Sequence, residues 1–209
     1  ERHLMVEKKI PGAGTLKMVY DKRDRLRCTQ NANQALLNEW SFTKYDVLNR
    51  PVITGIVICT TSVKTAIDAL PLNETRNNTL SSYGYSSNTF PKSGGTILTA
   101  AYYDNYDFIS GMNLDDSLNS AKYDDGAYNF ASNADLNPTG QVTGTMTKVL
   151  SAPADGGAMP LSVLFSAIYY DKYGHLLRTV SENQLKGKDI TSNVYEDITF
   201  QVLQTKQEH

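Results

Sequence analysis

The stretch Ala167–Arg178, AIYYDKYGHLLR, decides how this chain folds. Apolar residues flank a short polar segment, in which Asp171 is followed three residues later by Gly174. A type I turn favours Asp at its first position and Gly at its fourth. The Asp side chain accepts a hydrogen bond from the backbone two residues on, and Gly takes a positive φ without strain. The stretch therefore predicts a β-hairpin, with His175 and Leu176 beginning the second strand.

The same Tyr-Asp pattern occurs at three other places, in the segments VYDKRDRL, KYDVLNRP and YYDNYDFI. The third residue after the Asp is always Asp, Asn or Gly, the residue types that best tolerate a positive φ. The predicted turn residues are Tyr20, Asp21 and Asp24; Tyr45, Asp46 and Asn49; Tyr103, Asp104 and Asp107; and Tyr170, Asp171 and Gly174. Successive tyrosines are 25, 58 and 67 residues apart, so we expect hairpins separated by insertions instead of a solenoid of fixed period.

The sequence beside these turns alternates between apolar and polar residues, as in Leu16, Met18 and Tyr20. A period of two indicates half-buried antiparallel strands. The chain is therefore predicted to be all-β, an open curved sheet of hairpins in a single module, 1–209, with irregular insertions at 60–95 and 113–140. One short helix is expected near 62–70, because Ser62 can cap it and Pro71 can end it.

Composition excludes some classes of protein. Of the 209 residues, 40% are hydrophobic and 20% charged, and the net charge is -2. Nucleic-acid-binding proteins usually carry a basic excess, so no nucleic-acid partner is expected. No apolar run approaches the roughly 20 residues of a membrane-spanning helix, so no membrane span is expected in this segment. Cys28 and Cys59 could be free thiols or a disulfide, which only their geometry can decide.

The Tyr-Asp motifs resemble those of the YD-repeat (RHS) family, whose repeats carry Tyr-Asp, two variable residues, Gly, Arg and an apolar residue. YDKYGHL keeps all but the Arg, YDKRDRL and YDVLNRP keep the Arg but have Asp24 and Asn49 for the Gly, and YDNYDFI keeps neither. The sequence around the motifs is similar to segments of large RHS-type proteins of Bacteroidetes.

This resemblance implies a ribbon of β-hairpins in a secreted or cell-envelope protein. In the family such ribbons form hollow shells, often around a C-terminal toxin, or adhesive surface structures. The chain has no signal peptide or initiator Met and ends in strand-like sequence, so we expect a piece of a larger protein whose first partner is the rest of its own chain. An open hairpin sheet also has unpaired edge strands, which predict an edge-strand dimer.

Candidates for chemistry are few. The three histidines are His3, His175 and His209, and neither cysteine has a His at a suggestive spacing. His175 stands where the family has Arg, which favours a structural role beside the turn. The acidic residues Asp115, Asp116, Asp124, Asp125 and Asp135 invite the idea of a calcium site, but the EF-hand spacing is absent, so a solvated loop is expected. We therefore expect no catalytic residue, cofactor or metal, and no enzyme.

The expected function is a non-catalytic shell or scaffold segment. The alternative is an adhesion module that binds a glycan or a surface protein, because exposed aromatic rings stack on sugars and anchor interfaces. Its candidate residues are Tyr83, Tyr85, Tyr102, Tyr106, Tyr123 and Tyr128, together with Trp40. Their clustering on one exposed face would favour the alternative. An enzyme built on a carboxylate pair is a third hypothesis.

Overall fold

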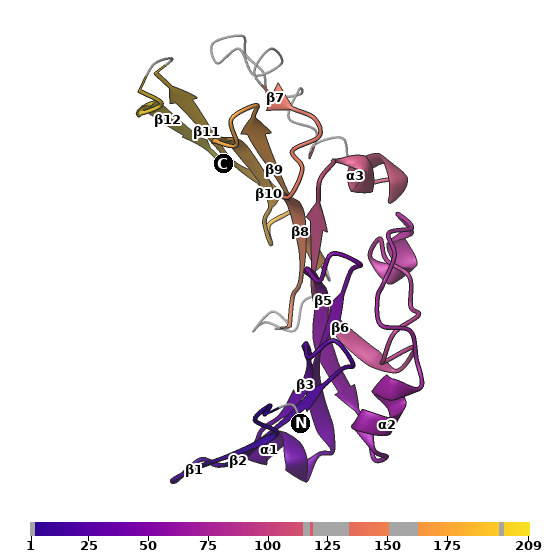
Figure 1. The fold of residues 1–209 in the computed structure, drawn as a ribbon. Helices are drawn as coiled ribbons and strands as arrows, with labels where there is room; N and C mark the ends of the chain where they lie inside the picture. Colours follow the sequence, from indigo (N-terminus) through magenta and orange to yellow (C-terminus); the bar gives the residue numbers. More distant parts are fainter. Residues whose placement is uncertain (1–2, 115–117, 119–133, 151–162, 197–198) are drawn as a thin grey trace. The chain divides into compact units, whose positions relative to one another are not determined.

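The computed structural model describes residues 3–114, 118, 134–150, 163–196 and 199–209 (Figure 1). Within these residues twelve strands form one open sheet in the order β1-β2-β3-β4-β5-β6-β8-β9-β10-β11-β12, and β7 pairs with β9 beside this path. Antiparallel pairing joins the strands in order from β1 to β6 and from β8 to β12, and it also joins β7 to β9. The prediction of an open, all-β sheet of antiparallel strands is confirmed.

The chain divides into two compact units. The first comprises Glu1–Asn77 and Gly84–Ala100, and the second comprises Asn78–Tyr83 and Ala101–His209. Among the described residues, no helix has the length and apolar character needed to cross a membrane.

The first unit consists of five strands, the start of a sixth and two short helices. The strands are β1 (Glu7–Ile10), β2 (Gly14–Tyr20), β3 (Leu26–Gln30), β4 (Glu39–Tyr45), β5 (Pro51–Ile58) and β6 (Gly95–Tyr103), and the helices are α1 (Ala32–Leu36) and α2 (Val63–Asp68). Phe42, Val52 and Ile53 are buried on the sheet. Two apolar residues of α2, Val63 and Ile67, are buried as well.

Helix α2 is the helix that the sequence predicts near 62–70. The Ser62 side chain accepts a hydrogen bond from the backbone N–H of Thr65, which caps the first turn. Helix α1 was not predicted, although Asn31 and Gln34 cap it reciprocally with their side chains. That pairing is a capping box, which the sequence shows as Asn followed three residues later by Gln.

The second unit contains the end of β6 and the remaining elements. They are the 3₁₀ turn η1 (Leu80–Ser82), α3 (Asp107–Gly111), β7 (Ala134–Asp135), β8 (Val142–Lys148), β9 (Val163–Asp171), β10 (Leu176–Glu182), β11 (Lys188–Tyr195) and β12 (Val202–Glu208). Its core holds Tyr102 stacked on Phe108, with ring centroids 4.4 Å apart. Gly144 leaves room for that stack, because a Cβ there would lie 2.3 Å from Cζ of Phe108.

Both cysteines are free thiols, Cys28 buried and Cys59 half-buried. Burial raises the pKa of Cys28 to about 12, so this thiol stays protonated and unreactive at neutral pH. The acidic loop lies outside the described residues except for Asp135, which belongs to β7.

Candidate functional site

Three of the predicted turns share one backbone geometry, and each begins at an Asp: Asp21, Asp46 or Asp171. The N–H of that Asp donates to the carbonyl of the fourth residue after it, at 3.0 Å in all three hairpins. Its own carbonyl accepts from the N–H of the third residue after it. These third residues are left-handed: Asp24 (φ 63°), Asn49 (φ 65°) and Gly174 (φ 86°). The residue types at this position thus match the backbone that the turn requires.

The Asp carboxylate closes each turn from inside, as Asp46 shows. Its Oδ1 accepts from the N–H groups of Leu48 and Arg50, both at 2.9 Å, and its Oδ2 accepts from Nε of Arg50 at 2.7 Å. Asp21 accepts from Arg23 and Arg25 in the same way, including Nε of Arg25 at 2.9 Å. The fourth residue after the Asp, which we call the closing residue, therefore contributes its side chain as well as its backbone.

His175 is the closing residue of the third turn. Its Nδ1 lies 2.8 Å from Oδ2 of Asp171, the position that an Arg Nε takes in the other two turns. Burial alone would raise the pKa of Asp171. The hydrogen bonds from the His175 side chain and from the N–H groups of His175 and Tyr173 outweigh burial, and the pKa of Asp171 falls below its ordinary value.

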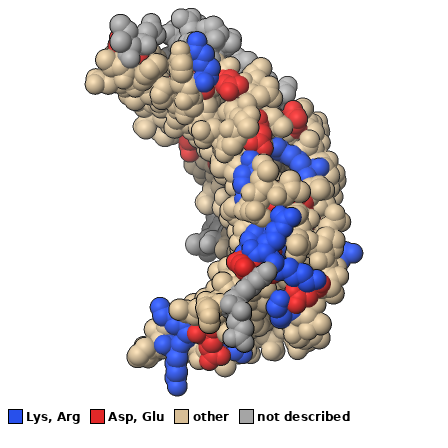
Figure 2. All heavy atoms as spheres, in the orientation of Figure 1, with Lys and Arg blue, Asp and Glu red and all other residues tan. Residues whose placement is uncertain are grey.

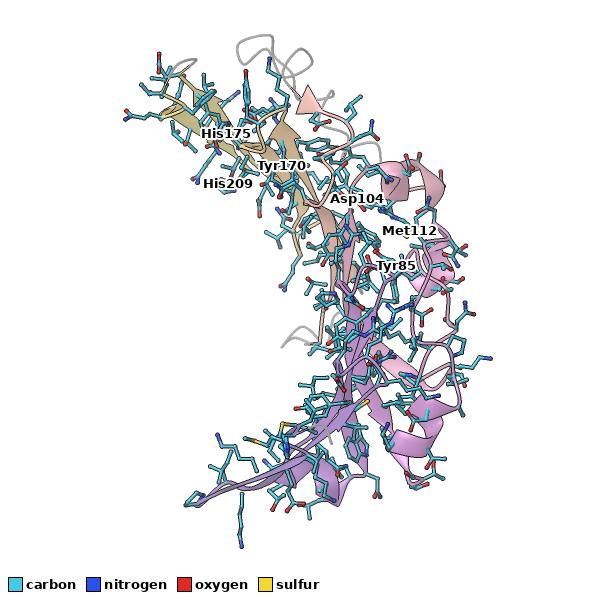
Figure 3. The ribbon with its side chains drawn as sticks, in the orientation of Figure 1. Tyr85, Asp104, Met112, Tyr170, His175 and His209 are labelled. Atoms are coloured by element: carbon cyan, nitrogen blue, oxygen red, sulfur yellow. The ribbon has the colours of Figure 1, made fainter. Side chains whose placement is uncertain are left out.

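The predicted tight turn at Tyr103, Asp104 and Asp107 is wrong. Asp104 is itself left-handed, with a φ of 73°, and Asp107 begins helix α3. The chain leaves the sheet at Asp104, at the end of β6 (Figure 3).

A residue far along the chain completes the Tyr103 hairpin instead. The N–H of Asp104 donates to the carbonyl of Gln141 at 3.1 Å, and Oδ1 of Asp104 accepts from the N–H of Gly140 at 2.7 Å. Gly140 is left-handed, with a φ of 83°. Gly140 and Gln141 thus stand where Gly174 and His175 stand in the contiguous turn, with the whole insertion between Asp104 and them.

A fifth copy begins at Tyr195, and sequence reasoning missed it. The N–H of Glu196 donates to the carbonyl of Gln201, and the left-handed Phe200 donates its N–H to the carbonyl of Glu196. Glu replaces Asp here and the loop is one residue longer, which hides the motif. One signal was available: Tyr195 follows Tyr170 by 25 residues, as Tyr45 follows Tyr20.

The four contiguous hairpins of Tyr20, Tyr45, Tyr170 and Tyr195 also carry a β-bulge directly after the turn. The Tyr pairs with the residue after the closing residue, and the next residue has no partner in the register. These extra residues are Arg27, Val52, Leu177 and Leu203. The first three are buried, with 2%, 1% and 8% of their surface exposed. The bulge therefore adds a side chain to the core that strict alternation would not place there.

The tyrosines connect one hairpin to the next. Tyr45 donates its hydroxyl to the carbonyl of Leu26 at 2.8 Å, and Tyr195 donates to Leu176 at 2.9 Å. In both cases the acceptor follows the closing residue of the preceding hairpin. Burial raises the pKa of Tyr45 and of Tyr195, which keeps both hydroxyls protonated as donors.

Tyr170 follows the same rule. Its hydroxyl donates to the carbonyl of Val142 at 2.9 Å, and Val142 follows Gln141, the closing residue of the Tyr103 hairpin. This hydrogen bond, the tyrosine tie, is thus made at Tyr45, Tyr170 and Tyr195.

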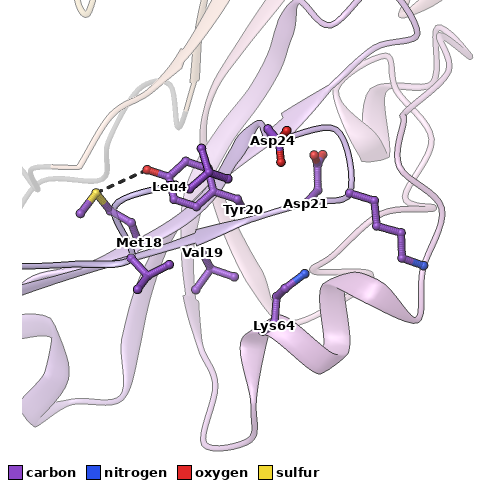
Figure 4. A pocket seen from close by; sticks show the side chains of 9 residues that line it. Leu4, Met18, Val19, Tyr20, Asp21, Asp24 and Lys64 are labelled. Carbon is purple, nitrogen blue, oxygen red and sulfur yellow. Dashed lines mark hydrogen bonds between the residues drawn. The ribbon is translucent and has the colours of Figure 1, made fainter. Parts of the chain in front are cut away.

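Tyr20 differs from these three. Its hydroxyl approaches Sδ of Met18 at 3.7 Å, and among the described residues no backbone carbonyl accepts from it (Figure 4). The ring borders a groove of about 560 Å³. The groove is also lined by Leu4, Val6, Met18, Asp24 and Lys64.

Neighbouring turns of the first unit contact each other through arginines. Nη1 of Arg23 and Nη1 of Arg25 both donate to Oδ1 of Asn49, at 3.2 and 3.0 Å. The guanidinium of Arg25 also lies over the ring of Tyr45, 4.7 Å from its centroid. The Tyr20 and Tyr45 hairpins are therefore joined at their turns as well as along their strands.

A buried acid, Glu74, fastens the insertion at 60–95 to the sheet. Its carboxylate, in a residue that is 1% exposed, accepts from Nζ of Lys44 at 2.9 Å. It also accepts from the hydroxyl of Ser86, the N–H of Asn88, and both the N–H and the hydroxyl of Thr89. Burial raises the pKa of Glu74, but the hydrogen bonds and Lys44 outweigh burial and lower it. All of these hydrogen bonds to Glu74 hold the insertion at 60–95 in place.

Arg27, the bulge residue of β3, reaches the same insertion. Its Nη1 donates to the carbonyl of Leu72 at 3.1 Å, and its Nη2 donates to Oγ1 of Thr89 and to the carbonyl of Phe90. Sequence reasoning missed Arg27, Lys44 and Glu74, because each is a single charge whose partners lie far along the chain.

The described tyrosines among the candidates for ligand binding do not gather on one exposed face. Tyr102 is fully buried and Tyr85 is 4% exposed, so their burial does not support a binding role for either ring. Tyr106 is half-buried against Tyr169 and donates to the carbonyl of Ile168, and Tyr83 is half-buried too. A Tyr whose hydroxyl reaches a backbone carbonyl can bury its ring without leaving a polar group unpaired. Tyr123 and Tyr128 lie outside the described residues.

The described residues include no group of three His, Cys, Asp or Glu side chains placed to hold a metal ion. On the face shown in Figure 2, basic and acidic side chains lie close to one another instead of forming a surface of one sign. No protein-family model matches the chain, and no curated protein matches it in sequence.

Proposed function

We propose that this chain is a non-catalytic scaffold segment of a secreted or cell-envelope YD-repeat protein. The observation that supports this proposal most is the repetition of one hairpin geometry at Tyr20, Tyr45 and Tyr170. Variants of it occur at Tyr195, where the loop is one residue longer, and at Tyr103, where an insertion separates the two sides of the hairpin. Repeated copies joined in series are the construction of a ribbon. The Asp and His side chains that could suggest catalysis in the sequence are parts of these hairpins.

The Asp carboxylates have structural roles that conflict with acid catalysis. Asp21, Asp46 and Asp171 each accept two backbone N–H groups and one side-chain donor. A general acid needs a raised pKa. The pKa values of Asp21 and Asp171 are lowered instead, because their hydrogen bonds outweigh burial. The carboxylates of Asp21 and Asp171 therefore hold their turns closed and remain ionised.

The tyrosine ties support a serial arrangement. Each tie joins a hairpin to the one before it in the chain, so the contacts run from neighbour to neighbour, as in repeat proteins. The adhesion alternative has no such support, because Tyr85 and Tyr102 are buried.

An exchange of turns tests the scaffold role. The quadruple variant Val47→Lys, Leu48→Tyr, Asn49→Gly and Arg50→His gives the Tyr45 turn the sequence of the Asp171–His175 turn. If turns are interchangeable structural parts, the variant folds and its free energy of unfolding stays within about 1 kcal/mol of the wild-type value. Urea denaturation measures both.

The matched control adds Asp46→Ala to the same four changes. We expect it to lose about a further 1.5–3 kcal/mol, because the Asp46 carboxylate accepts two backbone N–H groups and the closing side chain. Equal stability of the two variants would contradict the interchange of turns. A hydrolase activity of the wild-type chain that Asp171→Asn abolishes would overturn the scaffold role itself.

A further inference from the structure

Three pairs of neighbouring hairpins meet at the same two turn positions. One position is the closing residue of the earlier hairpin, and the other is the left-handed residue of the later hairpin. These pairs are Arg25 with Asn49, Gln141 with Gly174, and His175 with Phe200. Each pair lies within one compact unit, and its two hairpins are also joined by a tyrosine tie.

The first pair is held by a hydrogen bond. Nη1 of Arg25 donates to Oδ1 of Asn49 at 3.0 Å, and Nη1 of Arg23 donates to the same oxygen at 3.2 Å. The Arg25 guanidinium also lies over the ring of Tyr45, the tyrosine of the later hairpin. Two cationic side chains of the earlier turn thus share one acceptor on the later turn.

The second pair is a close approach. A Cβ at Gly174 would lie 3.4 Å from Nε2 of Gln141, so a larger side chain at this position would meet the glutamine. The left-handed residue is here the smallest one, and the closing residue of the earlier hairpin is a long amide.

The third pair is an aromatic stack. The rings of His175 and Phe200 have centroids 4.9 Å apart and an interplanar angle of 28°. Tyr173, which holds the position of Arg23 in its own turn, packs on Phe200 with ring centroids 5.0 Å apart. His175 also lies 5.2 Å from the ring of Tyr195, the tyrosine of the later hairpin. The contacts of the first pair are therefore repeated with aromatic rings.

The backbone of Phe200 indicates that this stack is selected for. Its φ of 56° is strained for a bulky residue, and a glycine would remove the strain. The ring is 39% exposed because it packs against Tyr173 and His175. The contact with the earlier hairpin thus offsets the strain of the left-handed position.

We propose that the closing residue of each hairpin recognises the left-handed residue of the next, so that this pair of turn positions selects which hairpins become neighbours. Misassembly of similar units is a characteristic failure of repeat proteins. A mismatched pair of turn residues loses its hydrogen bond or its stack, which disfavours the wrong neighbour. The inference rests on the proposed function, because it treats the hairpins as successive members of one ribbon.

A double-mutant cycle on the third pair tests this selection. His175→Gln alone and Phe200→Gly alone each create a mismatched pair, whereas the double variant carries the residues of the Gln141–Gly174 pair. The equilibrium constant of unfolding in urea is measured for all four proteins. Because either single change already removes the stack, the double variant should be about 2- to 12-fold more stable than the product of the two single effects predicts.

The matched control is a cycle of His175→Gln with Leu185→Gly. Leu185 is 91% exposed in the turn after β10, and that strand separates it from His175. The two changes should therefore combine independently, within about twofold. Proton NMR gives a second measurement: the ring protons of His175 should shift in Phe200→Gly, because the neighbouring ring no longer shields them. Circular dichroism confirms that each variant is folded.

Two results would overturn the selection: independent effects of His175→Gln and Phe200→Gly, or His175 ring protons that keep their positions in Phe200→Gly. Neither would affect the scaffold role, which the exchange of turns tests at the Tyr45 hairpin. Conversely, a hydrolase activity lost in Asp171→Asn would overturn the scaffold role even if the cycle shows coupling.

Discussion

Asp46 shows what a Tyr-Asp turn requires of its first residue. The side chain is short enough for one oxygen to accept from the N–H groups of Leu48 and Arg50 while the other accepts from Nε of Arg50. Hydrogen bonds to an ionised group are stronger than neutral ones. Arg50 and His175 are equivalent closing residues because each offers a ring or guanidinium nitrogen at the same distance from the carboxylate, 2.7 and 2.8 Å.

Replacing Asp46 by Ala should therefore lower the free energy of unfolding by about 1.5–3 kcal/mol, since the two N–H groups and the Arg lose a charged acceptor. Urea denaturation measures the loss. Asp68→Ala is the control, because Asp68 forms a partly exposed ion pair with Lys64, and such pairs contribute at most about 0.5 kcal/mol. Similar losses in the two variants would contradict the role given to Asp46.

At the scale of single residues, the sequence predicts a backbone conformation well when the cause lies in the residue itself and its near neighbours. Asp24, Asn49 and Gly174 could be assigned to left-handed positions, because their residue types tolerate that backbone. Asp107 satisfied the same criterion and was wrong, since the left-handed residue of its hairpin is Gly140, far along the chain. Phe200 is left-handed although its residue type does not favour it, so no local signal indicated it.

At the scale of the element, strand pairs make room for large side chains with small ones. Gly55 of β5 pairs with Phe42 of β4, and a Cβ on Gly55 would lie 2.6 Å from the ring and 2.3 Å from the carbonyl oxygen of Thr96. The glycine thus allows the ring to lie across the strand while β6 pairs on the other side.

Gly55→Ala should cost about 1–3 kcal/mol of unfolding free energy, because both the ring and the neighbouring strand must shift. Thermal and urea unfolding measure this loss. Thr54→Ala, next to it in the strand, removes a hydroxyl contact with Thr99 and should cost less than about 1 kcal/mol. A fully tolerated Gly55→Ala would show that Phe42 is not packed as described.

The elements differ in how far the sequence indicates them. Helix α2 has a capping Ser62 and two apolar residues on one face, so it could be predicted. The attachment of the 60–95 insertion could not, because Glu74 binds Lys44 and Thr89 through contacts that no local pattern encodes. The tyrosine ties could not be predicted for the same reason. A Tyr is typical of a β-strand whether or not its hydroxyl donates to a carbonyl far along the chain.

For the whole molecule, buried and clamped carboxylates predict how stability depends on pH. The pKa values of Asp21, Glu74 and Asp171 are lowered in the folded chain, because hydrogen bonds to the carboxylates outweigh the opposing effect of burial. The unfolded chain, with carboxyl pKa values of about 4, then binds more protons than the folded chain at acidic pH.

The stability from these carboxylates is therefore complete above pH of about 4–5 and is lost as the pH falls through their folded values. Urea unfolding measured from about pH 7 to about pH 2 should show this decline. Asp171→Asn removes one titrating group, so its stability is lower at neutral pH and falls less steeply in acid. A wild-type stability that is constant or rises toward acid pH would contradict the account.

The all-β class and the open sheet follow from period-two strands and turn chemistry, which are local and repeated. The division into two units does not follow from such local patterns, because it depends on where contacts between distant parts of the chain are dense. Within each unit, tyrosine ties join neighbouring hairpins, and each tie needs its Tyr to stand at the end of a strand and its acceptor carbonyl to stand just after a turn. The irregular spacing of the motifs conceals this order in the sequence.

The most direct test of this order is the free energy of unfolding of four single variants in one series: Tyr20→Phe, Tyr45→Phe, Tyr170→Phe and Tyr195→Phe. Measured on dilute, monomeric protein, the last three should each lose about 0.5–1.5 kcal/mol, because each removes the donor of a tie. Tyr20→Phe should change stability by no more than a few tenths of a kcal/mol, since its hydroxyl approaches only the Met18 sulfur at 3.7 Å. Equal effects at all four positions would contradict the proposal that tyrosine ties join the hairpins in series.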